Sequence, residues 1–497
     1  MKVKFQKMAS LLFALCAVLA AGYGKELDSG EVPSGIKEYE ITVNGKPVKC
    51  NYTYVYDERA PEKTLTLDRG YGTPARNTIA VSTVGYCNFD FEGSAQVEVK
   101  VKNLNKVTSA TIRPLSKNIV PTIDGTVVKF RVTSPAQLTL EVNGSESRAL
   151  HIFADNPDKN KPDPNAANVR YFGKGTHELR ASAMRTGETL YLDNEAHVYL
   201  VPAVGDTGTT ATAMIRGTNI SNITIAGRGI LDFSRYPDKD FERRSSVRFD
   251  RCSNVTVQGV TLIGSPLWNL QFRECSNLTI DNAKIISYFY NSDGIDICTC
   301  KDVVVKNCFL RQRDDAICVK AFRGTVQRKA QNIVVENCTI WSDWGYALGV
   351  TYEVQDPAEN IEFRNCDIIH ATTKGQGVIG VLLSDYGDVT DVRFKNITIE
   401  RSLKPLILLS QMISNWTTGS ELGTIKNVSF SNIRYLSGAR QPVRLNAVQG
   451  TASIDNITFE GLVFLGSPIN SVTDWDFNLN DKVGSEIYLN GKKLFAP

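Results

Sequence analysis

The sequence predicts an all-β protein in which a small β-sandwich domain precedes a right-handed parallel β-helix. A strand unit that recurs nine times in the second part of the chain predicts the β-helix, and short alternating segments ahead of it predict the sandwich. The chain has 497 residues, of which 42% are hydrophobic and 22% charged, so it has room for both parts. This composition is typical of folded proteins and argues against a disordered chain.

The recurring unit begins with Asn or Asp and continues as a short strand. Its starts are separated by 32, 23, 25, 30, 28, 31, 36 and 29 residues, which suits coils with a common core and loops of different length. Such short strands cannot bury an apolar face alone, but stacked about 4.8 Å apart they form parallel sheets around one core. No helical periodicity accompanies them, which excludes helical repeats. The units begin at Asn222, Asn254, Asn277, Asp302, Asn332, Asn360, Asp391, Asn427 and Asn456.

Two further positions of the repeat are regular. One is an asparagine after the first strand, which we expect to satisfy backbone groups at an interior bend. The other is a cysteine, which we expect to be a small buried apolar residue rather than a zinc ligand. Their members are Asn282, Asn307, Asn337, Asn365, Asn396 and Asn432 for the first position, and Cys308, Cys338 and Cys366 for the second.

The region before the repeat divides into three segments. Residues 1–24 carry lysines, an apolar run and small residues, as a cleaved signal peptide does, so we expect a secreted or periplasmic protein. Residues 25–155 alternate as a β-sandwich does, and Cys50 and Cys87 could form a disulfide there. The polar, proline-rich segment 156–167 is predicted to be a linker, and 168–497 the β-helix domain.

Charge and hydropathy exclude two classes of partner. Lys and Arg number 56 against 53 for Asp and Glu, and no basic run offers a nucleic-acid footprint. No apolar run after the signal peptide is long enough to cross a membrane.

Carboxylates interrupt the apolar pattern on two adjacent coils. Asp293 and Asp296 lie on one coil, and Asp314 and Asp315 follow 21 residues after Asp293, about one coil later. We therefore expect these acids to converge on one wall. Inverting glycosidases need such crowding, because one carboxylic acid protonates the leaving oxygen while a carboxylate roughly 6.5–9.5 Å away activates water. The alternatives are a Ca²⁺ site and a solvated acidic turn.

The motif Asn291-Ser-Asp-Gly-Ile-Asp296, followed by Asp314-Asp315, resembles the polygalacturonase family of glycoside hydrolases, family 28. The resemblance runs from about Asn168 to Phe464, and the sandwich ahead of the helix is similar to the related dextranase and isopullulanase family. It implies a pectin-lyase-like fold and an inverting glycoside hydrolase without a cofactor or metal. It also implies that Asp314 is the general acid, that Asp293 and Asp315 hold the attacking water, and that Asp296 is a supporting acid.

Two motifs of that family are replaced in this chain. Trp344-Gly-Tyr-Ala347 stands where the family has Gly-His-Gly, and Gly380-Val-Leu-Leu-Ser-Asp385 stands where it has Arg-Ile-Lys. Loss of the Arg and Lys removes the main binding groups for a uronic acid and makes a neutral glycan plausible. Other cations could still supply charge, namely Arg311, Arg313, Lys320 and Arg323.

We expect the substrate to be a polysaccharide or oligosaccharide with α-glycosidic bonds. The predicted substrate-binding residues are Trp344, Tyr346, Arg313 and Lys320, the two aromatic ones as platforms for sugar rings. Two rival functions remain. A Ca²⁺-dependent polysaccharide lyase would use Arg313 or Lys320 as its base, and a non-catalytic carbohydrate-binding β-helix would leave the aspartates dispensable.

Overall fold

The computed structural model describes residues 38–59, 61–66, 78–204, 213–235, 245–373, 376–448, 450 and 453–494. The predicted signal peptide and the first residues of the predicted sandwich lie outside these ranges. In the described part the fold is almost entirely β, with one short 3-10 helix, η2 (Leu115–Lys117). No helix in these ranges is both long and apolar enough to span a membrane.

The N-terminal part is a sandwich of two mainly antiparallel sheets. The first has the order β2-β1-β6-β9-β8, and the second β3-β5-β11-β10-β7 with β4 paired to β5. Apolar side chains from both sheets, such as Val97 and Leu138, alternate inward and form one core. The strands are β1 (Tyr39–Val43), β2 (Lys46–Val48), β3 (Asn51–Tyr56), β4 (Lys63–Thr66), β5 (Thr78–Asp90), β6 (Ala95–Val101), β7 (Ala110–Arg113), β8 (Thr122–Asp124), β9 (Val127–Val132), β10 (Ala136–Val142) and β11 (Ser145–Asp155).

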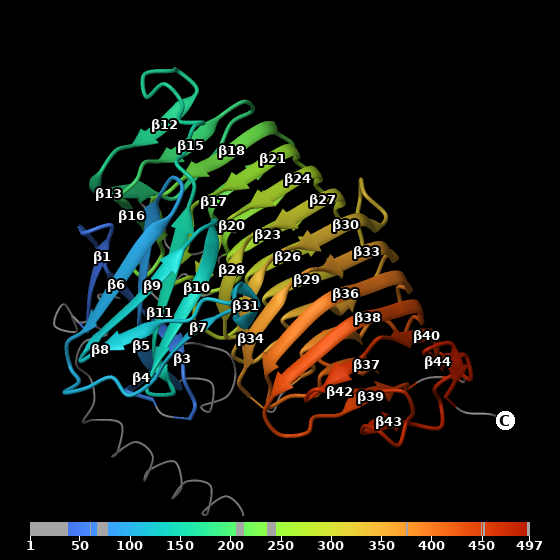
Figure 1. The fold of residues 1–497 in the computed structure, drawn as a ribbon. Helices are drawn as coiled ribbons and strands as arrows, with labels where there is room; N and C mark the ends of the chain where they lie inside the picture. Colours follow the sequence, from blue (N-terminus) through green and yellow to red (C-terminus); the bar gives the residue numbers. More distant parts are fainter. Residues whose placement is uncertain are drawn as a thin grey trace, which may run out of the picture.

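The rest of the chain is a right-handed parallel β-helix with three faces (Figure 1). Residues 156–167 carry no strand, and the helix strands start at Val169. The first face contains β12 (Val169–Phe172), β15 (Thr189–Leu192), β18 (Ser221–Gly227), β21 (Ser253–Gln258), β24 (Ser276–Asp281), β27 (Lys301–Lys306), β30 (Ala330–Glu336), β33 (Ala358–Arg364), β36 (Val389–Arg401), β38 (Ile425–Ser437), β40 (Ile454–Glu460) and β44 (Ile487–Leu489).

The second face joins the first at a bend, which the long strands β36 and β38 cross without interruption. It contains β13 (Gly175–Arg180), β16 (Ala196–Val201), β19 (Ile230–Asp232), β22 (Thr261–Ile263), β25 (Lys284–Ile286), β28 (Phe309–Gln312), β31 (Thr339–Ser342), β34 (Asp367–Ala371) and β41 (Val463–Phe464). At the end of the helix, β42 (Ser467–Pro468) and β45 (Lys492–Lys493) pair antiparallel with β41 and β44.

The third face is a separate parallel sheet in the order β14-β17-β20-β23-β26-β29-β32-β35-β37-β39-β43. It carries the predicted aspartates. Its strands are β14 (Ser182–Ala183), β17 (Ala213–Thr218), β20 (Ser245–Asp250), β23 (Leu270–Arg273), β26 (Ile295–Cys298), β29 (Ile317–Ala321), β32 (Leu348–Val354), β35 (Ile379–Leu383), β37 (Ile407–Gln411), β39 (Val443–Asn446) and β43 (Phe477–Leu479).

The Asn and Asp residues that begin the nine repeat units all have positive φ, between 52° and 57°. Asn and Asp tolerate this left-handed conformation better than other residues with a side chain, which explains their recurrence. Their side chains are linked between coils, for example from Asn254 Nδ2 to Asn222 Oδ1 at 2.9 Å. The second asparagine row is also left-handed, but it lies at an outer bend rather than an interior one, which corrects our expectation.

The interior of the helix is a stack of like side chains. Phe363, Phe394, Phe430 and Phe459 stack in sequence with ring centroids 4.9, 4.8 and 5.4 Å apart. Cys308, Cys338 and Cys366 are buried thiols, as expected. The thiols of Cys50 and Cys87 are also free, so the disulfide considered for them is not formed.

The sandwich packs along the second face of the helix (Figure 1). Apolar residues from both parts form one cluster, in which Tyr86 and Phe153 of the sandwich meet Phe309 and Trp341 of the helix. A second cluster joins Tyr54 and Tyr56 to Tyr288 and Phe289. The sandwich therefore reaches the loops that precede the third face.

Candidate active site

Asp293, Asp314, Asp315 and Tyr346 lie at the entrance to three neighbouring strands of the third face. Asp293 precedes β26, Asp314 and Asp315 precede β29, and Tyr346 precedes β32. The sheet hydrogen bonds continue into this segment, since Gly294 N donates to Asp315 O at 2.8 Å and Ala316 N donates to Tyr346 O at 2.8 Å. The repeat register thus fixes the three coils in line and brings the carboxylates together.

The ammonium group of Lys320, on β29, lies among the carboxylates. Its Nζ is 3.8 Å from Asp293 Oδ2, 3.9 Å from Asp315 Oδ2 and 3.0 Å from Glu353 Oε2. Only 2% of Lys320 is exposed. A buried cation at this position offsets the mutual repulsion of the acids.

Asp315 is the most firmly held of the acids. Its Oδ1 accepts the backbone N–H of Tyr346 at 2.8 Å and its Oδ2 accepts the hydroxyl of Thr351 at 2.8 Å. Asp314 is half-buried, and its Oδ1 accepts the N–H of Asp315 at 3.0 Å. The neighbouring acids therefore differ in environment, with Asp315 enclosed and Asp314 facing solvent.

Burial raises the pKa of Asp293, Asp296 and Asp315. The pKa of Asp293 is raised well above its ordinary value by burial and by Asp296 and Asp314. Burial also raises the pKa of Asp315 to about 6, against the opposing effect of Lys320. Separated protonation states in one cluster are what acid–base catalysis requires.

Asp296, on β26, is fully enclosed beside the other acids. Burial raises its pKa to about 8, although Lys320 acts in the opposite direction. Its Oδ1 accepts the thiol of Cys318 at 3.1 Å, while its Oδ2 has no hydrogen-bond partner within the described chain. A protonated Asp296 adds no negative charge to the cluster at neutral pH.

Carboxylate oxygens of Asp293 and Asp315 and the sulfur of Cys318 lie within 4.8 Å of one another, a spacing compatible with a metal ion. The donor set does not suit Ca²⁺, which takes six to eight oxygen ligands. The ammonium of Lys320 already balances both carboxylates from less than 4 Å.

The predicted substrate-binding residues have different environments. Arg313 is enclosed by aromatic rings, with its Cζ 3.6 Å from the centroid of Tyr290, 4.6 Å from Tyr56 and 5.4 Å from Trp344. Trp344 is half-buried in this cluster. Tyr346 has no exposed surface, so its ring cannot serve as a platform, and its backbone holds Asp315 instead. Lys320 is committed to three carboxylates.

Two partly exposed aromatic rings that were not predicted as binding residues flank Lys320. Its Nζ is 5.1 Å from the ring centroid of Trp268 and 5.8 Å from that of Tyr352. Trp268 in turn lies 6.3 Å from the ring of Phe322. Trp268 and Tyr352 belong to the aromatic-rich segments near the acidic motifs, a signal too coarse to choose between individual rings.

The sequence offered no signal for Lys404. Its Nζ is fully buried and donates to the carbonyls of Trp344 and Gly345, both at 2.7 Å, and to Ser342 Oγ at 2.8 Å. A Cβ on Gly345 would lie 2.3 Å from Asp315 N, so this turn packs directly against the Asp314–Asp315 peptide. Lys404 therefore fixes the turn on which the aspartates rest.

Fold and acidic cluster together are those of carbohydrate-active β-helix proteins, and sequence comparison identifies the family. Residues 175–475 match the profile of glycosyl hydrolases family 28, and the chain belongs to that family. A polygalacturonase of Gossypium barbadense is 25% identical over 261 residues, covering 49% of this chain and 62% of that relative's length. An isopullulanase of Aspergillus niger is 21% identical over 444 residues, covering 79% and 73%.

Solved structures share the fold. Dex49A from Penicillium minioluteum superposes with a TM-score of 0.66 at 14% identity, over 94% of this chain and 96% of the other. An exopolygalacturonase from Thermotoga maritima gives a TM-score of 0.52 at 17% identity, over 65% of this chain and 84% of the other. The first match covers nearly the whole chain and the second about two thirds of it.

Proposed function

We propose that the protein is an exported glycoside hydrolase that cleaves α-glycosidic bonds of a polysaccharide or oligosaccharide with inversion. The observation that carries the proposal is the arrangement of Asp293 and Asp315 around Lys320, with Asp314 half-exposed beside them. The family membership supports hydrolysis, and the apolar N-terminal segment supports export.

In the proposed mechanism Asp314 is the general acid that protonates the leaving oxygen. Its partial exposure suits contact with a bound glycan, whereas the other acids are buried. Asp315 and Asp293 hold the attacking water on the opposite side of the sugar ring, and Asp315 accepts its proton. Asp315 is the better carrier of negative charge because Thr351, Tyr346 N and Lys320 all stabilise its ionised form.

Trp268 and Tyr352 are proposed as the platforms for the sugar rings, with Trp344 forming part of the wall. The partly exposed rings of Trp268 and Tyr352 border the cation at the centre of the acids. Apolar sugar faces stack on such rings, while the hydroxyls reach the carboxylates. Arg313 packs among the aromatic rings of the wall and holds them in place. It is proposed to contact substrate only at the edge of this wall.

The lyase alternative fits the site less well. A lyase base must lose a proton, yet Glu353, Asp293 and Asp315 hold the pKa of Lys320 well above its ordinary value despite burial. The guanidinium of Arg313 is packed among three rings. Neither side chain is poised to abstract a proton.

Purified protein incubated with pectic, α-glucan and galactan polymers provides the test, with product anomers followed by NMR. We expect a β anomer from an α bond and no ultraviolet-absorbing unsaturated product. Asp314→Asn should lower kcat by a factor of about 100 or more, whereas Asp124→Asn, at an exposed site of the sandwich, should not. Retention of configuration would overturn the assigned roles, an unsaturated product would indicate a lyase, and full turnover by Asp314→Asn would exclude it as the acid.

A further inference from the structure

Two adjacent cavities lie between the sandwich and the β-helix, away from the aspartates. The larger has a volume of about 640 Å³ and the smaller about 420 Å³. Both are bordered by Asn156, Arg228 and Gln258, and none of their lining residues belongs to the third face. Volumes of this size are typical of binding sites for small ligands.

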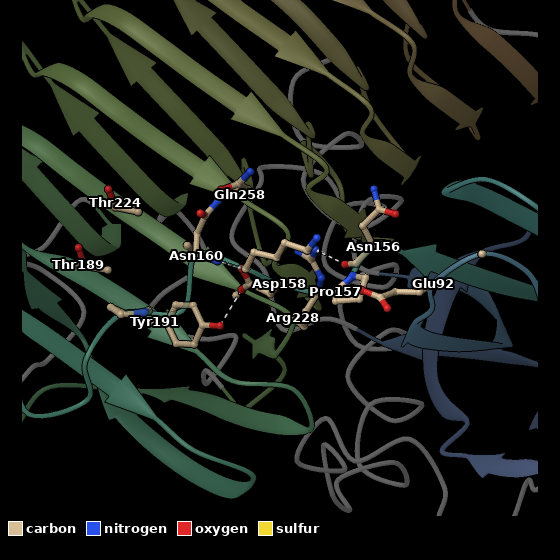
Figure 2. Close-up of a pocket in the computed structure, with 15 residues that line it drawn as sticks. Glu92, Asn156, Pro157, Asp158, Asn160, Thr189, Tyr191, Thr224, Arg228 and Gln258 are labelled. Carbon is tan, nitrogen blue, oxygen red and sulfur yellow. Dashed lines mark hydrogen bonds between the residues drawn. The ribbon is translucent and has the colours of Figure 1, made fainter.

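Four charged side chains line the larger cavity, and their formal charges cancel, since Glu92 and Asp158 are acidic and Lys159 and Arg228 are basic. Arg228 Nε lies 3.2 Å from Asp90 Oδ1. Asp158 Oδ2 accepts the hydroxyl of Tyr191 at 2.7 Å (Figure 2). Arg228 also donates to the carbonyl of Asn156 at 3.0 Å. These groups shape the cavity and leave little net charge for an ionic ligand.

Uncharged polar groups on the same walls have free hydrogen-bonding capacity. The side chains of Gln258, Asn160, Thr189 and Thr224 line the larger cavity, and within the described residues none of them makes a side-chain hydrogen bond. Amides can donate and accept at once, and hydroxyls likewise. The free groups therefore match a ligand rich in hydroxyls.

The smaller cavity interrupts the outer asparagine row. Beyond the cavity the row is continuous, since Asn396 donates to Asn365 at 3.0 Å and Asn432 donates to Asn396 at 3.0 Å. At the cavity the side-chain amide of Asn337 makes no such bond within the described chain. Gln137, only 7% exposed, also borders the cavity and has a buried Oε1 without a donor. An unsatisfied buried amide oxygen such as that of Gln137 is costly and indicates that a polar partner belongs there, whereas the exposed amide of Asn337 is accessible to a ligand.

We propose that the two cavities form an accessory binding site for a neutral oligosaccharide, separate from the cleavage site. The formal charges of the side chains that line the larger cavity cancel, whereas its amides and hydroxyls named above make no side-chain hydrogen bond in the described chain, which favours a neutral glycan over a uronate. Asparagines of the row recur about one strand spacing apart, roughly 4.8 Å, so an extended glycan meets similar groups at successive coils. The site would hold one segment of a polymer on the enzyme, and it does not depend on the proposed cleavage chemistry.

Calorimetric titration of the Asp314→Asn protein with maltohexaose, isomaltohexaose and an α-galactohexaose tests the proposal, with hexagalacturonate as the charged comparison. Ala226 lines the larger cavity on β18, so Ala226→Trp fills it. Ser431→Trp is the matched control, because Ser431 occupies the corresponding position on β38, seven strands further along the same face. Gln258→Ala is a milder second variant.

We expect at least one neutral hexasaccharide to bind with two events. Ala226→Trp should abolish one of them and Gln258→Ala should weaken the same event about tenfold, while Ser431→Trp leaves both intact. The proposal is overturned if no neutral sugar shows an event sensitive to Ala226→Trp and Gln258→Ala, or if hexagalacturonate binds at that site as tightly as the neutral sugars. Activity measured on the Asp314-intact variants tests cleavage separately.

Discussion

Lys320 Nζ lies 3.9 Å from Asp315 Oδ2, with both side chains almost completely enclosed. Asp315 lies on the same coil as Lys320, whereas Asp293 lies on the preceding coil, 3.8 Å from the ammonium, so the contact with Asp293 depends on the coil register as well as on the residues themselves. The cation lowers the pKa of both acids, against the effect of their burial.

Replacement of Lys320 by methionine should therefore disable the cluster. Without the ammonium the pKa values of Asp293 and Asp315 rise, and we expect kcat/KM to fall by a factor of about 100. The surviving activity should shift toward higher pH, which a pH–rate profile measures. Lys329→Met, at an exposed pair with Glu359, is the control. An unchanged profile for Lys320→Met would contradict the role of the cation.

The acid limb of the pH–rate profile should report Asp315. Because its pKa is raised to about 6 and the base must be ionised, activity should decline as the pH falls through about 6. Thr351→Val removes a hydrogen bond that favours the ionised form, so the limb should move upward by roughly half to one pH unit. Thr424→Val, at the exposed Asp388, should leave it in place. If the acid limb of Thr351→Val stays at the same pH as in the parent, the limb reports the titration of another group.

The coil register was predictable from the sequence, and with it the meeting of Asp293 and Asp315. Asn and Asp recur at every coil because each coil needs a left-handed residue there, and this recurrence makes the 21-residue separation interpretable as one turn. The family resemblance rested on the same aspartates. A backbone conformation that every coil requires therefore appears in the sequence as a residue type that recurs at regular intervals.

The packing around the cluster was not predictable in the same way. Tyr346 and Trp268 are both aromatic residues near the acidic motifs, yet one is buried and the other borders the site, since exposure depends on what neighbouring coils place against each ring. Tyr56 reaches Arg313 from the sandwich, more than 250 residues away in sequence. Contacts between distant segments leave no periodic pattern in the sequence. The burial of Tyr346 could therefore not be foreseen, and its ring was expected to bind substrate.

Asp296→Asn should stabilise the protein at alkaline pH. The pKa of Asp296 is about 8 in the folded state against 3.8 ordinarily, so the folded state binds its proton more tightly. Its contribution to stability is thus complete below about pH 4 and is lost as the pH rises through 8. Urea denaturation should show that the variant's free energy of unfolding exceeds the parent's by roughly 3–4 kcal/mol more at pH 8 than at pH 5. Equal differences at the two pH values would contradict this account.

Lys404 should control the turn beneath the catalytic pair without touching substrate. Lys404→Met leaves the carbonyls of Trp344 and Gly345 without their donor, and we expect kcat to fall about tenfold while KM changes little. Gly345→Ala disturbs the same turn by a different route, because its Cβ would meet the Asp314–Asp315 peptide. Both variants should therefore share the kcat defect.

Two matched substitutions serve as controls for these variants. Lys395→Met changes an exposed lysine on β36, and Gly173→Ala adds a Cβ whose nearest neighbour is a side-chain atom 3.8 Å away. Both should retain the parent kcat. If Lys404→Met and Gly345→Ala melt earlier but keep the parent kcat after folding is verified, the turn supports the fold alone. If kcat falls in the folded variants while KM is preserved, the turn serves to align Asp314 and Asp315.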